Sequence, residues 1–168
     1  MALVSKGPWL DDDEQKAWRS YLLMRRRLET HLSRHLQREF GVSKADFEIL
    51  VNLSESAVGR MRAYELGEAT QWEKSRLSHQ LRRMEERGLI RKAAGDGRYP
   101  EIVLTEQGRD TIVRCAPKNA ARVRSLFVEA IGPERLAVLT AACDDVVAAI
   151  DARERADPAG PDDADPPA

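Results

Sequence analysis

Between residues 70 and 108 the chain combines a basic amphipathic segment, a glycine stop and a short hairpin with a basic tip. Leu77, Leu81 and Met84 recur at the i, i+4, i+7 spacing of a buried helical stripe. Four polar residues then fall on the outward face of that helix: Ser75, His79, Arg82 and Arg83. An α-helix fits the major groove of duplex DNA, where polar side chains reach base edges and Arg or Lys meet phosphates. The pattern therefore predicts a helix that contacts DNA.

Charge is segregated along the chain, although the total is nearly neutral. The 168 residues include 27 Lys or Arg and 28 Asp or Glu, a formal net charge of -1. Residues 72–98 contain eight basic and four acidic residues, a net of +4, whereas residues 151–168 contain two and six, a net of -4. Such a local basic segment suits a nucleic-acid surface, and a merely solvated helix face is the alternative interpretation.

The composition predicts one mainly helical subunit, because 42% of the residues are hydrophobic and only 5% aromatic. No apolar run approaches the roughly 20 residues that span a bilayer, and the N-terminus lacks the pattern of a signal peptide. We therefore expect a cytoplasmic protein without membrane contact, in which Cys115 and Cys143 are thiols. The chain has no phosphate-binding glycine loop, nucleophile motif or catalytic carboxylate pair, so we expect no enzyme activity, no catalytic residue and no cofactor.

Helical periodicity and capping residues predict two helices before the basic one. An acidic cluster at 11–14 suits the positive end of a first helix over about 13–39, and Gly41 suits its left-handed end. Ser43 and Asp46 have the pattern of a capping box that opens a second helix. The apolar stripe of the second helix is predicted to contain Phe47, Leu50, Val51 and Leu53.

A short helix and the basic helix are predicted to form a helix-turn-helix. The short helix covers 61–69, with Leu66 as its core residue. Thr70 and Glu73 have a second capping-box pattern, so we expect the basic helix to begin beside them and to end at Gly88.

A β-hairpin is predicted directly after the basic helix. Strands at 89–94 and 99–105 flank the turn Gly95-Asp96-Gly97, and Ile102 and Leu104 share one side of the second strand. A hairpin in this position is the wing of a winged helix-turn-helix.

Two long helices are predicted beyond the wing. The first follows residue 106 and is expected to bend at Pro117, because proline removes one backbone hydrogen bond. The second begins at Gly132-Pro133, and its stripe within 136–150 is too apolar to face water alone. We therefore expect the terminal helices to form a layer between subunits. Residues from 151 onward, rich in Asp, Pro and Ala, are expected to be disordered.

The order of elements and the wing sequence resemble the MarR family of bacterial transcription regulators over most of residues 14–150. The run Met84-Glu85-Glu86-Arg87-Gly88-Leu89-Ile90 is similar to that family's helix ending. Its wing signature resembles Asp96-Gly97-Arg98, Val103-Leu104-Thr105 and Gly108-Arg109. These three features occur at consistent spacing within about 25 residues, which is more specific than one helix-turn-helix match.

The resemblance implies a mainly α fold with a small β-wing, in which residues 1–150 form one subunit. The winged helix-turn-helix lobe would cover 43–105, with dimerisation helices at 13–40 and 106–150 and a disordered acidic, Pro-rich tail at 151–168. It further implies a homodimer, most often a repressor, that binds double-stranded DNA. The basic helices would enter the major groove of a pseudo-palindromic operator, with half-sites about one helical turn apart.

The residues expected to contact DNA come from the basic helix and the wing. The helix candidates are Lys74, Ser75, Arg76, Ser78, His79, Arg82 and Arg83. Arg91 and Lys92 would add phosphate contacts. By resemblance, Arg98 would enter or flank the minor groove, while Asp96 would orient its guanidinium through hydrogen bonds.

Two further features qualify this set. The sequence Tyr99-Pro100-Glu101 departs from the family's wing, because Pro100 cannot donate to a strand ladder and Glu101 adds negative charge near the phosphates. Arg87 is instead expected to be structural, paired with an acid three or four residues away along the helix.

A small, often aromatic or phenolic, effector is common in this family and would bind between the dimer helices and the DNA-binding lobe. Candidate residues for its site are Trp18, Tyr21, Arg25, His31 and His35, for which ordinary dimer core is the alternative. His31, His35 and Glu39 recur every four residues, a spacing that suits one metal ion, but no fourth ligand is identifiable and we expect no metal site.

Two other interpretations remain. Oxidant sensing would need an exposed cysteine with a stabilised thiolate. Cys115, beside Arg114, has a slightly better setting than Cys143, which lies on an apolar stripe. We expect neither cysteine to sense oxidants. The alternative function is a winged-helix adaptor or antirepressor that binds a protein through the acidic tail. DNA affinity and its salt dependence separate that class from a DNA-binding regulator.

Overall fold

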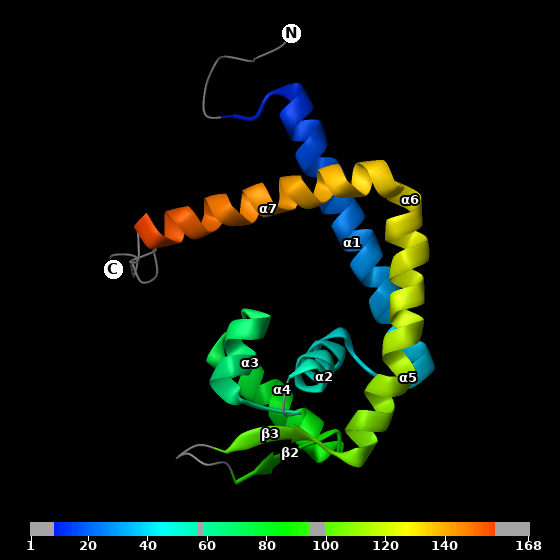
Figure 1. Cartoon of the computed structure of the whole chain (residues 1–168), viewed down its shortest axis with the longest axis vertical. Helices are drawn as coiled ribbons and strands as arrows, with labels where there is room; N and C mark the ends of the chain where they lie inside the picture. The colour runs from blue at the N-terminus through cyan, green and yellow to red at the C-terminus, as the bar shows by residue number, and fades with distance from the viewer. Residues whose placement is uncertain (1–8, 57–58, 95–99, 157–168) are drawn as a thin grey trace, which may run out of the picture. The chain divides into compact units, whose positions relative to one another are not determined.

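The computed structural model describes residues 9–56, 59–94 and 100–156. The chain forms two compact units, the first ending at Val123 and the second beginning at Arg124. Helices make up most of both units, and a small antiparallel sheet lies in the first (Figure 1). The predicted fold class, mainly α with a small β-wing, is confirmed.

The first unit begins with two helices and ends with a third. α1 (Asp12–Phe40) has Asp11 as its N-cap and ends at Gly41 in the left-handed conformation, with φ 65°. α5 (Glu106–Val123) packs along α1, and α2 (Lys44–Glu55) packs against both. The predicted acidic start and glycine end of the first helix are therefore confirmed.

The helix-turn-helix and its wing form the rest of the first unit, at the bottom of Figure 1. In chain order its elements are β1 (Arg60–Arg62), α3 (Ala63–Thr70), α4 (Lys74–Glu86), β2 (Ile90–Ala93) and β3 (Glu101–Leu104). The strand β1 is absent from the sequence prediction, which makes residue 61 helical and is wrong there. A strand of three residues is too short to show an alternating pattern in the sequence. β1 forms because β3 offers it a free edge. The sheet order is β1-β3-β2, with antiparallel neighbours.

One apolar core holds α2, α3, α4 and the sheet together. Its largest fully buried side chains include Ile49, Leu50, Leu53, Leu66, Met84 and Ile102. The predicted stripe of the basic helix is confirmed, because Leu77, Leu81 and Met84 are all buried. In α2 the buried side contains Asp46 and Ile49, whereas the predicted Phe47 and Val51 are only half-buried. One side of α4 is therefore fixed in the core, and the other side faces outward.

The start of α4 shows that the second capping-box prediction is wrong. Thr70 is the last residue of α3, and its buried hydroxyl donates to the Leu66 carbonyl at 2.6 Å. Gln71 follows in the left-handed conformation, and Glu73 is the N-cap of α4 without a side-chain hydrogen bond to the helix. Thr70 cannot cap α4 because the backbone of its own helix already binds its hydroxyl.

The junction between the wing and α5 is tightly packed. The Thr105 hydroxyl donates to the Gly88 carbonyl at 2.6 Å and accepts from the Gly108 N–H at 3.0 Å. A Cβ atom on Gly108 would overlap the backbone carbonyl of Leu89. Only glycine allows this close approach, so the glycine of the predicted wing exit has a packing role.

The second unit is helical in its described part except at Gly132. A π-helical turn at Arg124–Val128 precedes α6 (Glu129–Ile131) and α7 (Pro133–Ala156). The helix geometry changes at this π-turn, whereas α5 passes through Pro117 as an α-helix. α7 continues to Ala156, so the prediction of disorder from residue 151 is wrong for its first residues, and 157–168 lie outside the described ranges. No helix in the described ranges is long and apolar enough to cross a membrane.

Candidate DNA interface

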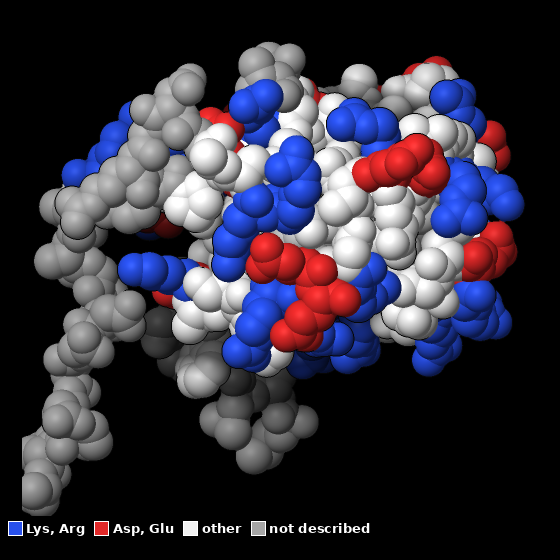
Figure 2. All heavy atoms as spheres, turned by 90° about the horizontal axis from the view of Figure 1, so that it is seen from below, with Lys and Arg blue, Asp and Glu red and all other residues white. Residues whose placement is uncertain are grey.

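The outward face of α4 carries the predicted polar and basic residues. All seven are exposed: Lys74, Ser75, Arg76, Ser78, His79, Arg82 and Arg83. Figure 2 looks at the molecule from below the view of Figure 1, and it shows Lys and Arg side chains over much of this end with acidic groups between them. Along the sequence, basic residues outnumber acidic ones by eight to four within residues 72–98, although the chain as a whole is nearly neutral.

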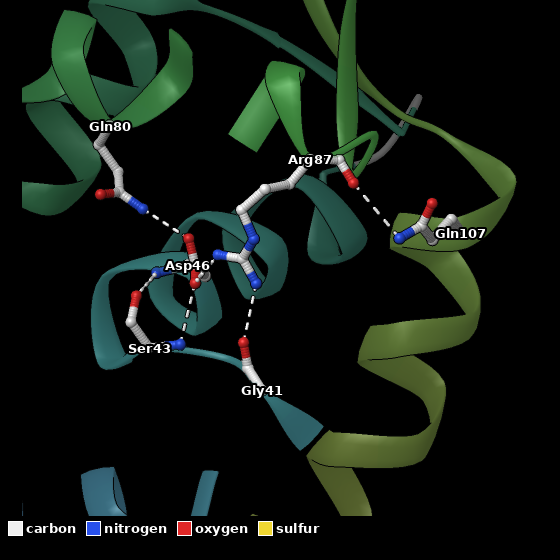
Figure 3. A network of polar contacts seen from close by, with 6 residues as sticks. All are labelled: Gly41, Ser43, Asp46, Gln80, Arg87 and Gln107. Carbon is white, nitrogen blue, oxygen red and sulfur yellow. Dashed lines mark hydrogen bonds and ion pairs between the residues drawn. The ribbon is translucent and has the colours of Figure 1, made fainter. Parts of the chain in front are cut away.

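A buried carboxylate fixes α4 against α2 (Figure 3). Asp46 accepts a hydrogen bond from the Gln80 side-chain amide at 2.6 Å and one from the Arg87 guanidinium at 2.7 Å. Arg87 also donates to the Gly41 carbonyl at 2.8 Å, and the Ser43 backbone N–H donates to Asp46 at 2.9 Å. Gln80 lies within α4 and Arg87 lies at its end, so the network attaches α4 to α2 at two points along the helix.

The same contacts determine the charge state of Asp46, which is 1% exposed. Burial by itself would raise the pKa of this carboxyl, but the Ser43 N–H and the Arg87 guanidinium outweigh burial and hold the pKa below 3.8. Asp46 is therefore an anion at neutral pH with partners supplied by the fold. The prediction of a capping box at Ser43 and Asp46 is confirmed. Arg87 is structural as predicted, but its partner lies on α2 and not along α4.

The strand β2 exposes Arg91 and Lys92, the two predicted phosphate contacts. Neighbouring residues of a strand point to opposite faces, so the side chains of Arg91 and Lys92 leave β2 in different directions. The Lys92 amine lies 3.4 Å from the Glu85 carboxylate of α4. In β3 the Glu101 carboxylate pairs with Arg60 of β1 at 3.3 Å, so a strand that the sequence did not predict offsets the negative charge of the wing.

The tip of the wing carries the predicted residues Asp96 and Arg98, which lie outside the described residues. The strands that lead to the tip are paired in register, with Ala93 opposite Glu101. The roles of Asp96 and Arg98 stay predictions from the resemblance.

Arg76 stacks on an aromatic side chain that the sequence analysis did not select. The guanidinium carbon of Arg76 lies 4.3 Å from the centroid of the Trp72 ring, and Trp72 is half-buried against the core. Arg82 differs, because it lies 3.9 Å from Glu86 and both side chains are exposed. The available signal was an aromatic residue four positions before an arginine, a spacing that places both on one side of a helical turn.

The predicted effector residues of α1 fall into separate groups. The rings of Trp18 and Tyr21 stack with centroids 5.6 Å apart, and the Arg25 guanidinium lies 5.9 Å from the Tyr21 ring. Trp18 and Tyr21 are exposed. A cavity of about 360 Å³ between α1, α2 and α5 is lined by none of the predicted residues. Its lining includes Leu32, Leu36, Phe47, Val51 and Asn119.

The two histidines of α1 have different partners. His31 Nε2 lies 3.2 Å from Arg122 of α5, whereas the buried His35 contacts the Glu39 carboxylate through Nδ1 at 3.0 Å. In the part of the chain that the structure describes, no group of His, Cys, Asp or Glu is arranged to hold a metal ion.

The two cysteines differ from their predicted settings. Cys115 is fully buried, and burial raises the pKa of its thiol against the opposing charge of Arg114. Cys143 is exposed on α7 of the single chain. The neighbouring arginine therefore does not make Cys115 the better thiolate, because desolvation outweighs its charge.

Comparison with known proteins agrees with the winged helix. A sequence profile of the bacterial regulatory protein, arsR family, matches residues 47–92. The structure matches AbsC, a MarR family transcriptional regulator from Streptomyces coelicolor, with a TM-score of 0.82 and 42% identity over 87% of this chain and 99% of that chain. A second MarR family regulator from Streptomyces coelicolor, solved in complex with DNA, has a TM-score of 0.79 and 34% identity over 84% and 94% of the two chains. A mutant MarR from E. coli complexed with operator DNA shares the fold, with a TM-score of 0.68 and 17% identity over 76% and 91% of the chains. No curated protein matches the chain.

A winged helix-turn-helix with an exposed basic helix defines a class of DNA-binding module. The identity and coverage of the two Streptomyces coelicolor regulators show more than this class: the chain belongs to the MarR family of transcriptional regulators. The arsR profile covers only the segment from α2 to β2, whereas the MarR matches extend over most of the chain.

Proposed function

We propose that the protein is a sequence-specific regulator that binds double-stranded DNA as a homodimer. One α4 helix would enter the major groove of each half of a pseudo-palindromic operator. The observation that carries this proposal is the exposed basic face of α4, which the Asp46 network holds against the core. The DNA complexes of its structural neighbours support it. A bacterial regulator of this kind works on the chromosome, in the cytoplasm.

The proposed contacts divide by chemistry. Short polar groups, the imidazole and an arginine in the first turns of α4 would reach base edges, and the other cations would hold phosphates. The base-contacting set is Ser75, Arg76, Ser78 and His79. The phosphate-contacting set is Lys74, Arg82, Arg83, Arg91 and Lys92. By family resemblance, Asp96 and Arg98 would carry the wing tip to the minor groove.

The terminal helices would supply the dimer interface. α7 has no buried residue, yet Val138, Val146, Val147 and Ile150 are 70%, 60%, 56% and 49% exposed. Apolar groups in this number favour a partner surface, and two-fold symmetry of the protein matches a pseudo-palindromic site. The Val147→Glu variant should shift the protein from dimer to monomer in light scattering, and a variant that stays fully dimeric would contradict this assignment of α7.

Repression is the proposed action, because a dimer seated on an operator blocks access to that DNA. An aromatic or phenolic effector would bind near the stacked Trp18 and Tyr21 with Arg25 as polar partner, and His31 and His35, further along α1, would mark a separate candidate position. Such a ligand releases DNA only if it binds the DNA-free dimer more tightly than the DNA-bound dimer.

The test of the proposal is selection of binding sites by the purified full-length protein from a random duplex library. Selected sites are then titrated over a range of salt concentrations. Enrichment of a pseudo-palindrome, with affinity that falls steeply as salt rises, is the expected result. Absence of any enriched sequence would refute the sequence-specific function and favour the winged-helix adaptor.

A further inference from the structure

Trp72 lies in the turn between α3 and α4, where the fold holds its side chain from two directions. Its backbone N–H donates to the Gly67 carbonyl at 3.2 Å, which closes the end of α3. Its side chain packs on the core and, with Tyr64 and Leu77, lines a cavity of about 560 Å³ between α3, α4 and the wing. A second, smaller hollow on the α4 surface is lined by Trp72 together with Arg76. The backbone of the turn is thus fixed by α3, and the half-buried indole packs on the core with open space beside it.

The Arg76 guanidinium contacts the Trp72 ring and keeps N–H groups that can donate to a ligand. The guanidinium carbon lies over the Trp72 ring, 4.3 Å from its centroid, and a cation in this position is attracted to the ring. The N–H groups of the guanidinium lie in the plane of the group and still reach acceptors at the edge. Across the described ranges Arg76 has no hydrogen-bond or ion-pair partner, whereas Lys92 and Arg82 each lie beside an acid.

The nearby side chains do not compete for Arg76. Gln80, one turn further along α4, already donates to the buried Asp46 carboxylate at 2.6 Å. The Arg76 side chain is exposed, so the open N–H edge is accessible to a ligand. Two parallel N–H groups match the O6 and N7 acceptors that guanine presents in the major groove.

We infer that Trp72 is a positioning residue for sequence recognition: it holds the Arg76 guanidinium so that its open edge donates to a guanine in each half-site. This inference rests on the proposed function. Without the indole, the flexible arginine would reach phosphates as readily as bases, and phosphate contacts carry no sequence information. Trp72 thus raises the ratio of operator binding to random binding without needing to touch DNA.

A double-mutant cycle on the full-length protein tests the inference, with the operator obtained by selection. Trp72→Leu keeps apolar bulk in the turn but removes the aromatic face. It should lower the preference for operator over random duplex by about threefold to tenfold, a change that corresponds to one cation–π contact. The lost discrimination should fall at the same base position as in Arg76→Ala. In the Arg76→Ala background, Trp72→Leu should change that preference by less than about twofold.

Two further variants separate positioning from a purely structural role. Trp72→Phe retains an aromatic face and should recover much of the preference, and it should do so in the Arg76 wild-type background but not in Arg76→Ala, a dependence on Arg76 that a packing defect in the turn would not show. Arg76→Lys keeps the charge and the affinity for random DNA but should lose discrimination at the guanine. If thermal unfolding shows that Trp72→Leu does not fold, the cycle is made with Trp72→Met, which also fills the turn without an aromatic face.

The inference is overturned if the Trp72 variants weaken operator and random DNA equally, or if their effects add to those of the Arg76 variants. These outcomes leave the proposed function intact, provided that the wild-type protein selects an operator. A wild-type protein that selects no sequence overturns both the proposed function and the role of Trp72.

Discussion

Replacing Asp46 by Asn tests whether the network of Figure 3 anchors the recognition helix. The substitution keeps the volume of the side chain but exchanges an anionic acceptor for a neutral amide, which has one oxygen and one NH₂ group. In the wild-type protein one carboxylate oxygen accepts from Gln80, and the other accepts from Arg87 and the Ser43 N–H. Either orientation of the new amide therefore places a donor against a donor.

The contacts give the expected size of the effect. A hydrogen bond to a charged group contributes about 1.5–3 kcal/mol, and a buried donor left without an acceptor costs about 1–3 kcal/mol. The Arg87 side chain is 41% exposed, so water replaces part of what it loses, whereas Asp46 has no access to water. We expect the free energy of unfolding to fall by about 2–3 kcal/mol, or the Tm by about 4–12 °C for a chain of this size.

The same carboxylate gives the stability a pH dependence with a defined sign. Because the pKa of Asp46 is lower in the folded protein than its ordinary value of 3.8, its contribution is complete above that value and is lost as pH falls through the folded pKa. The difference in Tm between wild type and Asp46→Asn should be widest at neutral pH and should shrink on acidification below pH 3.8. Thermal unfolding followed by circular dichroism, at one fixed protein concentration, measures this difference.

Glu86→Gln is the matched control, since it also neutralises a carboxylate paired with an arginine. That pair with Arg82 is 3.9 Å apart and both side chains are exposed. Its loss should change the stability by less than about 0.5 kcal/mol. An Asp46→Asn protein as stable as the Glu86→Gln protein at neutral pH, or a difference that does not vary with pH, would refute the anchoring role.

Three further outcomes are expected. Gly108→Ala should destabilise the protein by at least about 3 kcal/mol, because the new methyl group meets a backbone carbonyl. Gly67→Ala has only ordinary contacts nearby and should stabilise helix α3 by about 0.5–1 kcal/mol. Denaturant unfolding of both variants checks the contrast. In a Cys143→Ser protein, a thiol reagent should label the buried Cys115 only after unfolding, and rapid labelling of the native protein would contradict its raised pKa and burial. Arg91→Ala should weaken operator and random DNA alike and lower the salt slope by about one; a loss confined to the operator would place Arg91 at a base.

Local patterns carried most of the predictions that the structure confirmed. The buried stripe of Leu77, Leu81 and Met84 follows from helical periodicity, and the ends of α1 follow from the capping chemistry of Asp11 and Gly41. These features depend on residues within one or two turns of each other, so the sequence alone contains them.

The predictions that failed depend on partners far away in the chain. β1 exists only as an antiparallel partner of β3, and Thr70 ends α3 because the hydroxyl is bound by its own helix. The partner of Arg87 lies 41 residues earlier, at Asp46, and no acid stands three or four residues from Arg87 along the chain. The fold brings the buried carboxylate of Asp46 to Arg87, and no local spacing rule predicts this pair.

By itself the sequence determined that a basic helix has an outward polar face, that a hairpin follows it, and that the chain resembles MarR regulators. It did so because helix period, turn residues and wing motif are local properties of the chain. Only the tertiary structure decided which of the cations on this end of the molecule are used internally. The packing of α2 against α4 commits Arg87 to Asp46, and the left-handed turn at Gln71 brings Trp72 under Arg76. The guanidinium of Arg76 is exposed on α4 and, within the described residues, its contact is with the indole alone.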